Sequence, residues 1–200
     1  MQSAPIKWGY SGSADLLCGS GATRAERALA YGMAALLTAI VLGVDASRAA
    51  PIADGWSVLL LAFFAFDVAG GAVANMLNSC KRFYHSDLQA GEGGFARLAK
   101  RPAVFTAIHL HPIVAAFAFG GSLVNGLVWY LLLQAAVAIT LATPLYLRRA
   151  GAAAMTLLAL LGSQSLLPLG AGLEWFIPCL FIKLVLGHAV QEEPYRPVRA

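Results

Sequence analysis

The sequence predicts an all-α integral membrane protein, a bundle of six transmembrane helices with both chain termini in the cytoplasm. Hydrophobic residues make up 59% of the 200-residue chain and charged residues 12%, against about 45–50% and about 25% in soluble domains. The apolar residues also come in blocks close to the roughly 20 residues that cross a hydrocarbon core. Basic residues gather in alternate connections between these blocks, which is typical of a multi-pass topology.

The first elements follow from local signals. Residues 1–22 are polar and rich in Gly and Ser, so we expect a loosely ordered cytoplasmic segment. Thr23 and Glu26 have the spacing of a capping box, which predicts a helix start just before the first span, residues 28–44. A cleavable signal peptide is the alternative, because residues 46–50 are small, although the leader before the apolar block is long for one. The second span covers residues 55–77, and a long polar connection follows it.

The other four spans complete a membrane domain over residues 23–190. The third, 103–119, ends at a Gly-Gly-Ser turn that leads into the fourth, 123–147. Arg148 and Arg149 are expected to separate the fourth span from the fifth, 152–167. Pro168 and the glycines after it break the chain before the sixth, 173–190, and residues 191–200 form a cytoplasmic tail.

The distribution of charge predicts the orientation in the cell membrane. Of the loops expected outside, only the first carries a basic residue, Arg48, whereas the segments expected inside carry Lys7, Arg24, Arg27, Lys81, Arg82, Arg97, Lys100, Arg101, Arg148, Arg149, Arg196 and Arg199. Trp56 and Trp175 fall at the outer boundary. The basic balance thus reflects topology, so we expect membrane lipids as partners and no nucleic acid. The three cysteines are far apart and form no CxxC pair, so the sequence suggests neither a disulfide framework nor a zinc knuckle.

Polar residues inside the second span form one helical stripe. Their spacings of three and four residues place them on one face from mid-membrane to the cytoplasmic boundary: Asp67, Gly71, Asn75, Asn78, Arg82 and His85. A carboxylate near the bilayer centre costs roughly 2.5–3.5 kcal/mol, so this face must contact protein or water. It is either a functional lining or a packing seam between helices.

The third and sixth spans add further polar groups. His109 and His111 point to opposite faces of a regular helix, but Pro112 predicts a kink at residues 108–111 that can bring them together. In the sixth span, Lys183 lies at nearly the depth of Asp67, so we expect these two charges to pair. Glu192 follows one turn after His188, on the same face.

Several functions fit this convergence of polar groups in the cytoplasmic half. The leading hypothesis is a metal-dependent enzyme acting on a lipid or another apolar substrate, with zinc or iron held by His85, His109, His111 and His188. Asp67, Glu192 and Lys183 would be its catalytic residues, and Asn75 and Asn78 would line the site. No HExxH or other known metal motif appears.

Three alternatives remain open. A proton- or ion-coupled transporter or channel component would use the Asp67 stripe as its path, although no internal repeat is evident. A haem b electron-transfer protein would place His109 or His111 opposite His188 as axial ligands. A structural subunit would use the polar residues only to pack helices.

Overall fold

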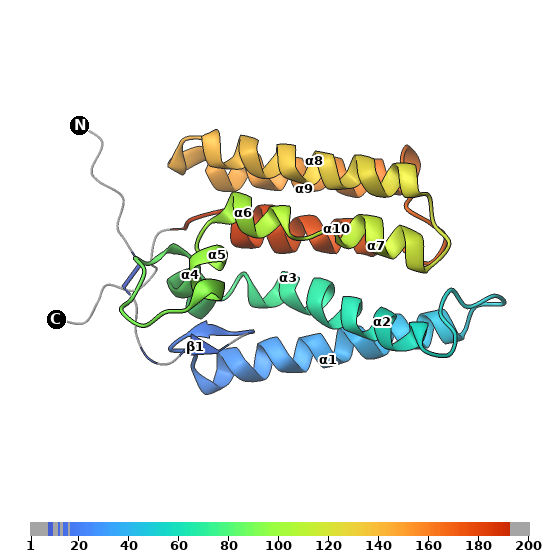
Figure 1. Ribbon diagram of the computed structural model, residues 1–200, viewed down its shortest axis with the longest axis horizontal. Helices are drawn as coiled ribbons and strands as arrows, with labels where there is room; N and C mark the ends of the chain where they lie inside the picture. Colours follow the sequence, from blue (N-terminus) through green and yellow to red (C-terminus); the bar gives the residue numbers. More distant parts are fainter. Residues whose placement is uncertain (1–7, 10–11, 13, 16, 193–200) are drawn as a thin grey trace.

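The computed structural model describes residues 8–9, 12, 14–15 and 17–192, and this part of the chain is mostly helical. Four helices are long and apolar enough to cross a membrane: Arg24–Ala46, Ser57–Ala74, Leu123–Ala142 and Leu145–Ser165. Two shorter apolar helices, Pro102–Ala118 and Phe176–His188, lie among them with their axes roughly parallel (Figure 1). The expected all-α fold with several helices long and apolar enough to cross a membrane is confirmed at this level. Lys7, Arg196 and Arg199 lie outside the described residues.

The N-terminal segment contains a small packed hairpin, whereas loose order was expected. Strands β1 (Ala14–Asp15) and β2 (Gly19–Ser20) pair antiparallel, and β2 packs on helix α4 (Asn78–His85). Gly19 has a φ of 73°, and a Cβ there would meet the Cα of Cys80 at 2.6 Å. Only glycine satisfies both conditions. The hairpin depends on contacts with α4, far along the chain, so no local apolar pattern in the sequence predicts it.

Helix α1 (Arg24–Ala46) begins at the capping box that the sequence predicted. The Thr23 hydroxyl accepts a hydrogen bond from the Glu26 N–H, and the Glu26 carboxylate accepts one from the Thr23 N–H. One face of α1 packs against the second apolar helix through Ala34, whose Cα would lie 2.9 Å from a Cβ added at Gly70. The two backbones therefore approach as closely as small residues allow.

The second apolar helix is interrupted twice. It consists of α2 (Ser57–Phe64), a π-helical segment η1 (Ala65–Gly70) and α3 (Gly71–Ala74). The chain then turns, Leu77 is extended, and α4 begins as a separate helix. The expected continuous stripe from Asp67 to His85 is therefore wrong beyond Asn75. Helix α4 is attached to the hairpin by Arg82, whose guanidinium donates hydrogen bonds to the Ser20 and Gly21 carbonyls.

A short helix, α5 (Gly94–Ala99), leads into the third apolar helix, which opens where Pro112 predicted. Helix α6 (Pro102–Ala107) stops before residues 108–110, and α7 (His111–Ala118) starts after them. At the opening, the Ile108 carbonyl accepts a bond from the Leu110 N–H at 3.0 Å. The kink is thus built into the backbone at the two histidines.

The boundary between the next two helices was predicted in the wrong place. Helix α8 (Leu123–Ala142) ends at Thr143, and α9 (Leu145–Ser165) follows Pro144, so Arg148 and Arg149 lie inside α9. Proline disfavours a helical conformation in the residue before it, and Thr143 is extended. Arg148 instead reaches back and donates to the Thr143 and Leu141 carbonyls at the end of α8.

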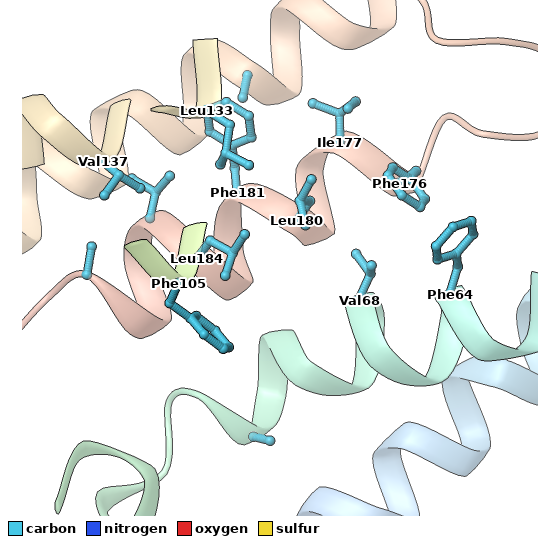
Figure 2. Packing of buried hydrophobic residues seen from close by; sticks show 14 of the residues in the cluster. Phe64, Val68, Phe105, Leu133, Val137, Phe176, Ile177, Leu180, Phe181 and Leu184 are labelled. Carbon is cyan, nitrogen blue, oxygen red and sulfur yellow. The ribbon is translucent and has the colours of Figure 1, made fainter. Parts of the chain in front are cut away.

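The last apolar helix forms the centre of the bundle. It joins α10 (Phe176–Phe181) to a second π-helical segment, η2 (Ile182–His188). Its side chains meet those of α2, η1 and α8 in the core, which Figure 2 shows for Phe64, Val68, Leu133, Val137, Phe176, Ile177, Leu180, Phe181 and Leu184. Because neighbours surround this helix, its polar residues Lys183 and His188 are held inside the protein.

Candidate functional site

One carboxylate joins three of the interrupted helices. The Lys183 Nζ lies 2.6 Å from Asp67 Oδ2, and the His111 Nε2 lies 3.2 Å from the same oxygen. The expected contact between Asp67 and Lys183 is therefore confirmed. The contact with His111 was not foreseen, because the histidines were assigned to a separate metal site. We call Asp67, Lys183 and His111 the carboxylate centre.

Each member of the carboxylate centre lies at a backbone irregularity. Asp67 is in π-helical η1, Lys183 is in π-helical η2, and His111 is the first residue of α7 after the opening in the third helix. Such π-helical turns are rare and occur frequently at functional sites. The irregular backbone turns the three side chains toward one point.

Burial differs sharply within the carboxylate centre. The side chain of Lys183 is 6% exposed and that of His111 is 17% exposed, whereas that of Asp67 is 34% exposed. The lysine stem passes over Gly71, where an added Cβ would meet its Cε at 2.8 Å. The ammonium is thus enclosed while one edge of the carboxylate stays accessible.

A row of aromatic rings continues from His111 to the other histidines. The His111 and His109 rings stack at 4.8 Å, and the ring of Phe105 lies 4.6 Å from His109 and 4.5 Å from His188. His85 follows at 6.4 Å from His188. The structure therefore brings all four histidines together as a row, which we call the histidine row. It does not gather them around one point.

Hydrogen bonds define which imidazole nitrogens are free. His109 Nδ1 lies 2.7 Å from the Phe105 carbonyl and His188 Nε2 lies 2.8 Å from the Ala99 carbonyl, so each of these nitrogens carries the proton. Three other buried nitrogens have no hydrogen-bond partner within the described residues: His85 Nε2, His111 Nδ1 and His188 Nδ1. His85 lies in α4, outside the membrane-length helices. Burial lowers the pKa of its imidazole to about 3, so this imidazole is neutral at physiological pH.

Asn75 connects the histidine row to the helix that carries Lys183. Its Nδ2 donates to the Lys183 carbonyl at 3.0 Å, and its Oδ1 accepts from the Tyr84 hydroxyl at 3.1 Å. The Tyr84 ring in turn lies 4.2 Å from His188. Asn75 therefore lines the site as predicted in position, with its amide oxygen and nitrogen both bonded.

The other two predicted site residues lie elsewhere. Asn78 starts α4, beyond the break in the second helix, and Glu192 follows η2. The Glu192 carboxylate lies close enough to Lys81 to favour the charged ammonium. Lys81 is fully buried, whereas the sequence indicated it only as one of the basic residues on the cytoplasmic side. Lys81 donates to the Gly187 and Val190 carbonyls, and burial lowers the pKa of its ammonium to about 8. No local pattern marked Lys81, because α4 is polar and lies in the long connection.

The geometry gives little support to a four-histidine metal site. Across residues 8–9, 12, 14–15 and 17–192, no three His, Cys, Asp or Glu side chains are placed so that they could hold a metal ion. A haem between His109 and His188 also meets an obstacle, because the Phe105 ring occupies the space between them.

Comparisons with known protein families, with curated proteins and with solved structures found no match. The distinctive features of the site are an ion pair shared with an imidazole inside an apolar bundle and a row of histidines with nitrogens that have no partner within the described residues.

Proposed function

We propose that this chain is a multi-pass protein of the cell membrane that binds and releases protons at Asp67, as a proton-coupled transporter or channel component. The observation that carries the proposal is the Asp67 oxygen shared by Lys183 and His111. Ionisable residues inside a membrane are costly, and they commonly mark proton relays and ion paths.

The carboxylate centre has two states that differ by one proton. With Asp67 ionised, the Lys183 ammonium and the carboxylate neutralise each other, and His111 donates its Nε2–H to the same oxygen. A proton that reaches the accessible edge of Asp67 cancels this negative charge and weakens both contacts. Because the three side chains come from three separate interrupted helices, such a change alters how these helices hold together.

The histidine row extends from this centre along the third and sixth apolar helices. The Phe105 ring, which carries no nitrogen, lies between His109 and His188, so the imidazoles alone do not form a continuous proton path. Water bound to the unpartnered nitrogens of His111, His188 and His85 would complete a hydrogen-bonded path. The row ends near α4, which lies in the long polar connection.

Six spans with both termini inside form part of this proposal. The four long helices would supply four of these crossings, and the two shorter apolar helices would supply the other two. In Figure 1 the N-terminal hairpin, α4 and α5 share one end of the bundle, and the α1–α2 connection lies at the other. The basic residues of the polar connection fall at the hairpin end, which the positive-inside rule places in the cytoplasm.

Cysteine labelling tests this topology. A chain with its three natural cysteines replaced by serine would carry one new cysteine, at Lys100, Asp54 or Gly121. We expect Lys100→Cys to react with a membrane-impermeant reagent only after the membrane is opened, and Asp54→Cys to react in intact cells. Gly121→Cys is informative only if the protein folds, because a Cβ at Gly121 would meet the Leu169 carbonyl oxygen. Labelling of Lys100→Cys in intact cells would reverse the orientation.

Proton flux tests the function. The purified protein is reconstituted into liposomes that contain a pH-sensitive dye, and a potassium gradient with valinomycin supplies the driving voltage. We expect flux above that of empty liposomes, and Asp67→Asn should abolish it. Asp54→Asn makes the same chemical change in the loop before α2 and should leave the flux unchanged. Flux that is absent from the wild type, or equal in Asp67→Asn, would overturn the proposal.

A metal-dependent enzyme acting on a lipid or another apolar substrate is the second candidate. It is favoured by the neighbouring rings of His85 and His188, which carry the unpartnered nitrogens Nε2 and Nδ1. These two nitrogens would hold zinc or iron, with water at the remaining positions. Elemental analysis of the detergent-purified protein tests it: one metal per chain that is lost in His188→Ala would support the enzyme, and a metal-free wild type would eliminate it.

A further inference from the structure

A pocket lies toward the end of the bundle opposite the hairpin, and its lining residue Leu61 is about 9 Å along the helix from Asp67. It occupies about 250 Å³ where α1 ends, α2 begins and α10 begins. Its wall is almost entirely apolar and includes Ile40, Val44 and Leu61. Ile40 and Val44 are themselves more than half exposed on the outer face of α1, so the pocket continues onto the surface that faces lipid.

Two hydrogen-bond donors in the pocket wall have no acceptor. Arg48 Nε and Trp175 Nε1 are both buried, and within the described residues neither makes a hydrogen bond. An unmade hydrogen bond to a buried donor is costly, and native proteins leave few of them. Arg48 and Trp175 both line this pocket, so their unpaired donors are candidates to bind acceptor oxygens of a ligand that enters it.

The carboxylates of the pocket wall define the rest of the ligand. Asp45 accepts hydrogen bonds from the Ile52 and Ala53 N–H groups, and this holds the loop after α1. Glu174 accepts one from the Gly172 N–H through Oε1, and the Glu174 side chain is exposed. A Cβ at Gly172 would meet the Arg48 Cζ at 3.4 Å, so the guanidinium lies over this glycine beside Glu174. One cation and two anions thus surround an apolar cavity.

We propose that this pocket binds one zwitterionic glycerophospholipid that carries a primary ammonium. Its phosphate accepts hydrogen bonds from Arg48 Nε and Trp175 Nε1, its ammonium lies beside Glu174, and part of one acyl chain lies along Ile40 and Leu61. A purely anionic head group would satisfy Arg48 but would face Glu174 and Asp45 as like charges. The pocket lies at a helix boundary, which is the depth of lipid head groups.

Native mass spectrometry of the detergent-purified chain tests this proposal. Two lipids with identical acyl chains are titrated, one with a phosphoethanolamine and one with a phosphoglycerol head group. We expect one molecule of the phosphoethanolamine lipid to bind at least tenfold more tightly. Soluble glycerophosphoethanolamine, which lacks the chains, should compete poorly, because the cavity wall is apolar.

Matched variants separate the pocket from general lipid adhesion. Trp175→Phe removes one N–H and keeps the aromatic ring, and we expect about a tenfold loss of affinity for the phosphoethanolamine lipid. Trp56→Phe makes the same change at an exposed tryptophan near the same end and should have no effect. Glu174→Gln should reduce the preference between the two lipids without abolishing binding.

The proposal is overturned by equal affinity for the two lipids in the wild type, or by unchanged binding in Trp175→Phe. Should Trp175→Phe fail to give a monodisperse protein, the comparison of the wild type with Glu174→Gln decides: an unchanged lipid preference would refute the proposal. Proton flux through the carboxylate centre is a separate measurement, so the two proposals can fail independently.

Discussion

Replacing Asp67 should destabilise the protein more than replacing Lys183, although both changes break the ion pair of the carboxylate centre. Asp67→Asn leaves the Lys183 ammonium, whose side chain is 6% exposed, without its carboxylate partner. Removing one partner of a buried pair costs about 3–5 kcal/mol, because the remaining charge is uncompensated. Lys183→Met should cost less, about 2 kcal/mol, roughly the value of one charged hydrogen bond. Asp67 then keeps His111, and its side chain is 34% exposed.

The double variant Asp67→Asn/Lys183→Met removes both charges together. We expect its loss of stability to be about 2–3 kcal/mol smaller than the sum of the two single losses, since neither variant residue is a buried ion. The free energies of unfolding would be measured in mixed micelles by titration with a denaturing detergent, followed by circular dichroism.

A distant pair provides the control for this cycle. Asp54→Asn combined with Lys183→Met changes the same residue types, with the acid placed in the loop before α2, and should be additive within about 0.5 kcal/mol. If the Asp67 and Lys183 losses are additive to the same degree, the two residues do not couple and the ion pair contributes nothing. Equal losses in the two single variants would refute the argument from exposure.

Two further predictions follow from close packing and from burial. Gly70→Ala should destabilise the protein by about 1–3 kcal/mol, because its Cβ would meet the Cα of Ala34 at 2.9 Å; Gly32→Ala, with open space around its Cβ, should be neutral or slightly stabilising in the same assay. For His85, the folded pKa of about 3 lies below the ordinary value of 6.5, so the unfolded chain binds more protons between these values and stability falls as the pH falls. The free energy of unfolding should drop by about 1.6 kcal/mol between pH 6.5 and pH 5 from this residue alone, and His85→Phe should remove that part of the pH dependence.

Contacts between residues of long apolar helices were predictable, because the position of a residue along such a helix gives its depth in the membrane. The rise of 1.5 Å per residue placed Asp67 and Lys183 at similar levels, and they are in contact. Pro112 predicted the opening at residues 108–110 for a local steric reason, and the Thr23–Glu26 spacing predicted the helix start in the same way. Each of these inferences depends on geometry within one or two turns.

Features that depend on long-range contacts were not predictable. The break at residues 75–77 contains neither Pro nor Gly, and α4 is held by bonds from Arg82 to the hairpin more than sixty positions away. The buried Lys81 likewise depends on carbonyls at the end of η2. The boundary at Pro144 was visible in the sequence, but the arginine pair four residues later was given more weight than the proline.

Polar residues that only pack helices and polar residues that bind protons are expected to differ in how completely their hydrogen bonds are made. A polar residue that only packs helices ends with its hydrogen bonds made, because an unmade bond in an apolar interior is costly. Asn75 meets that description, since its Nδ2 and its Oδ1 are both bonded to neighbouring elements. The imidazoles of His111 and His188 do not, because each keeps a buried nitrogen that has no hydrogen-bond partner in the described part of the chain. Asp67 departs further, since packing alone gives no reason for its carboxylate to keep an accessible edge beside an enclosed lysine. This contrast supports the proposal that Asp67, His111 and His188 exchange protons and do not only pack helices.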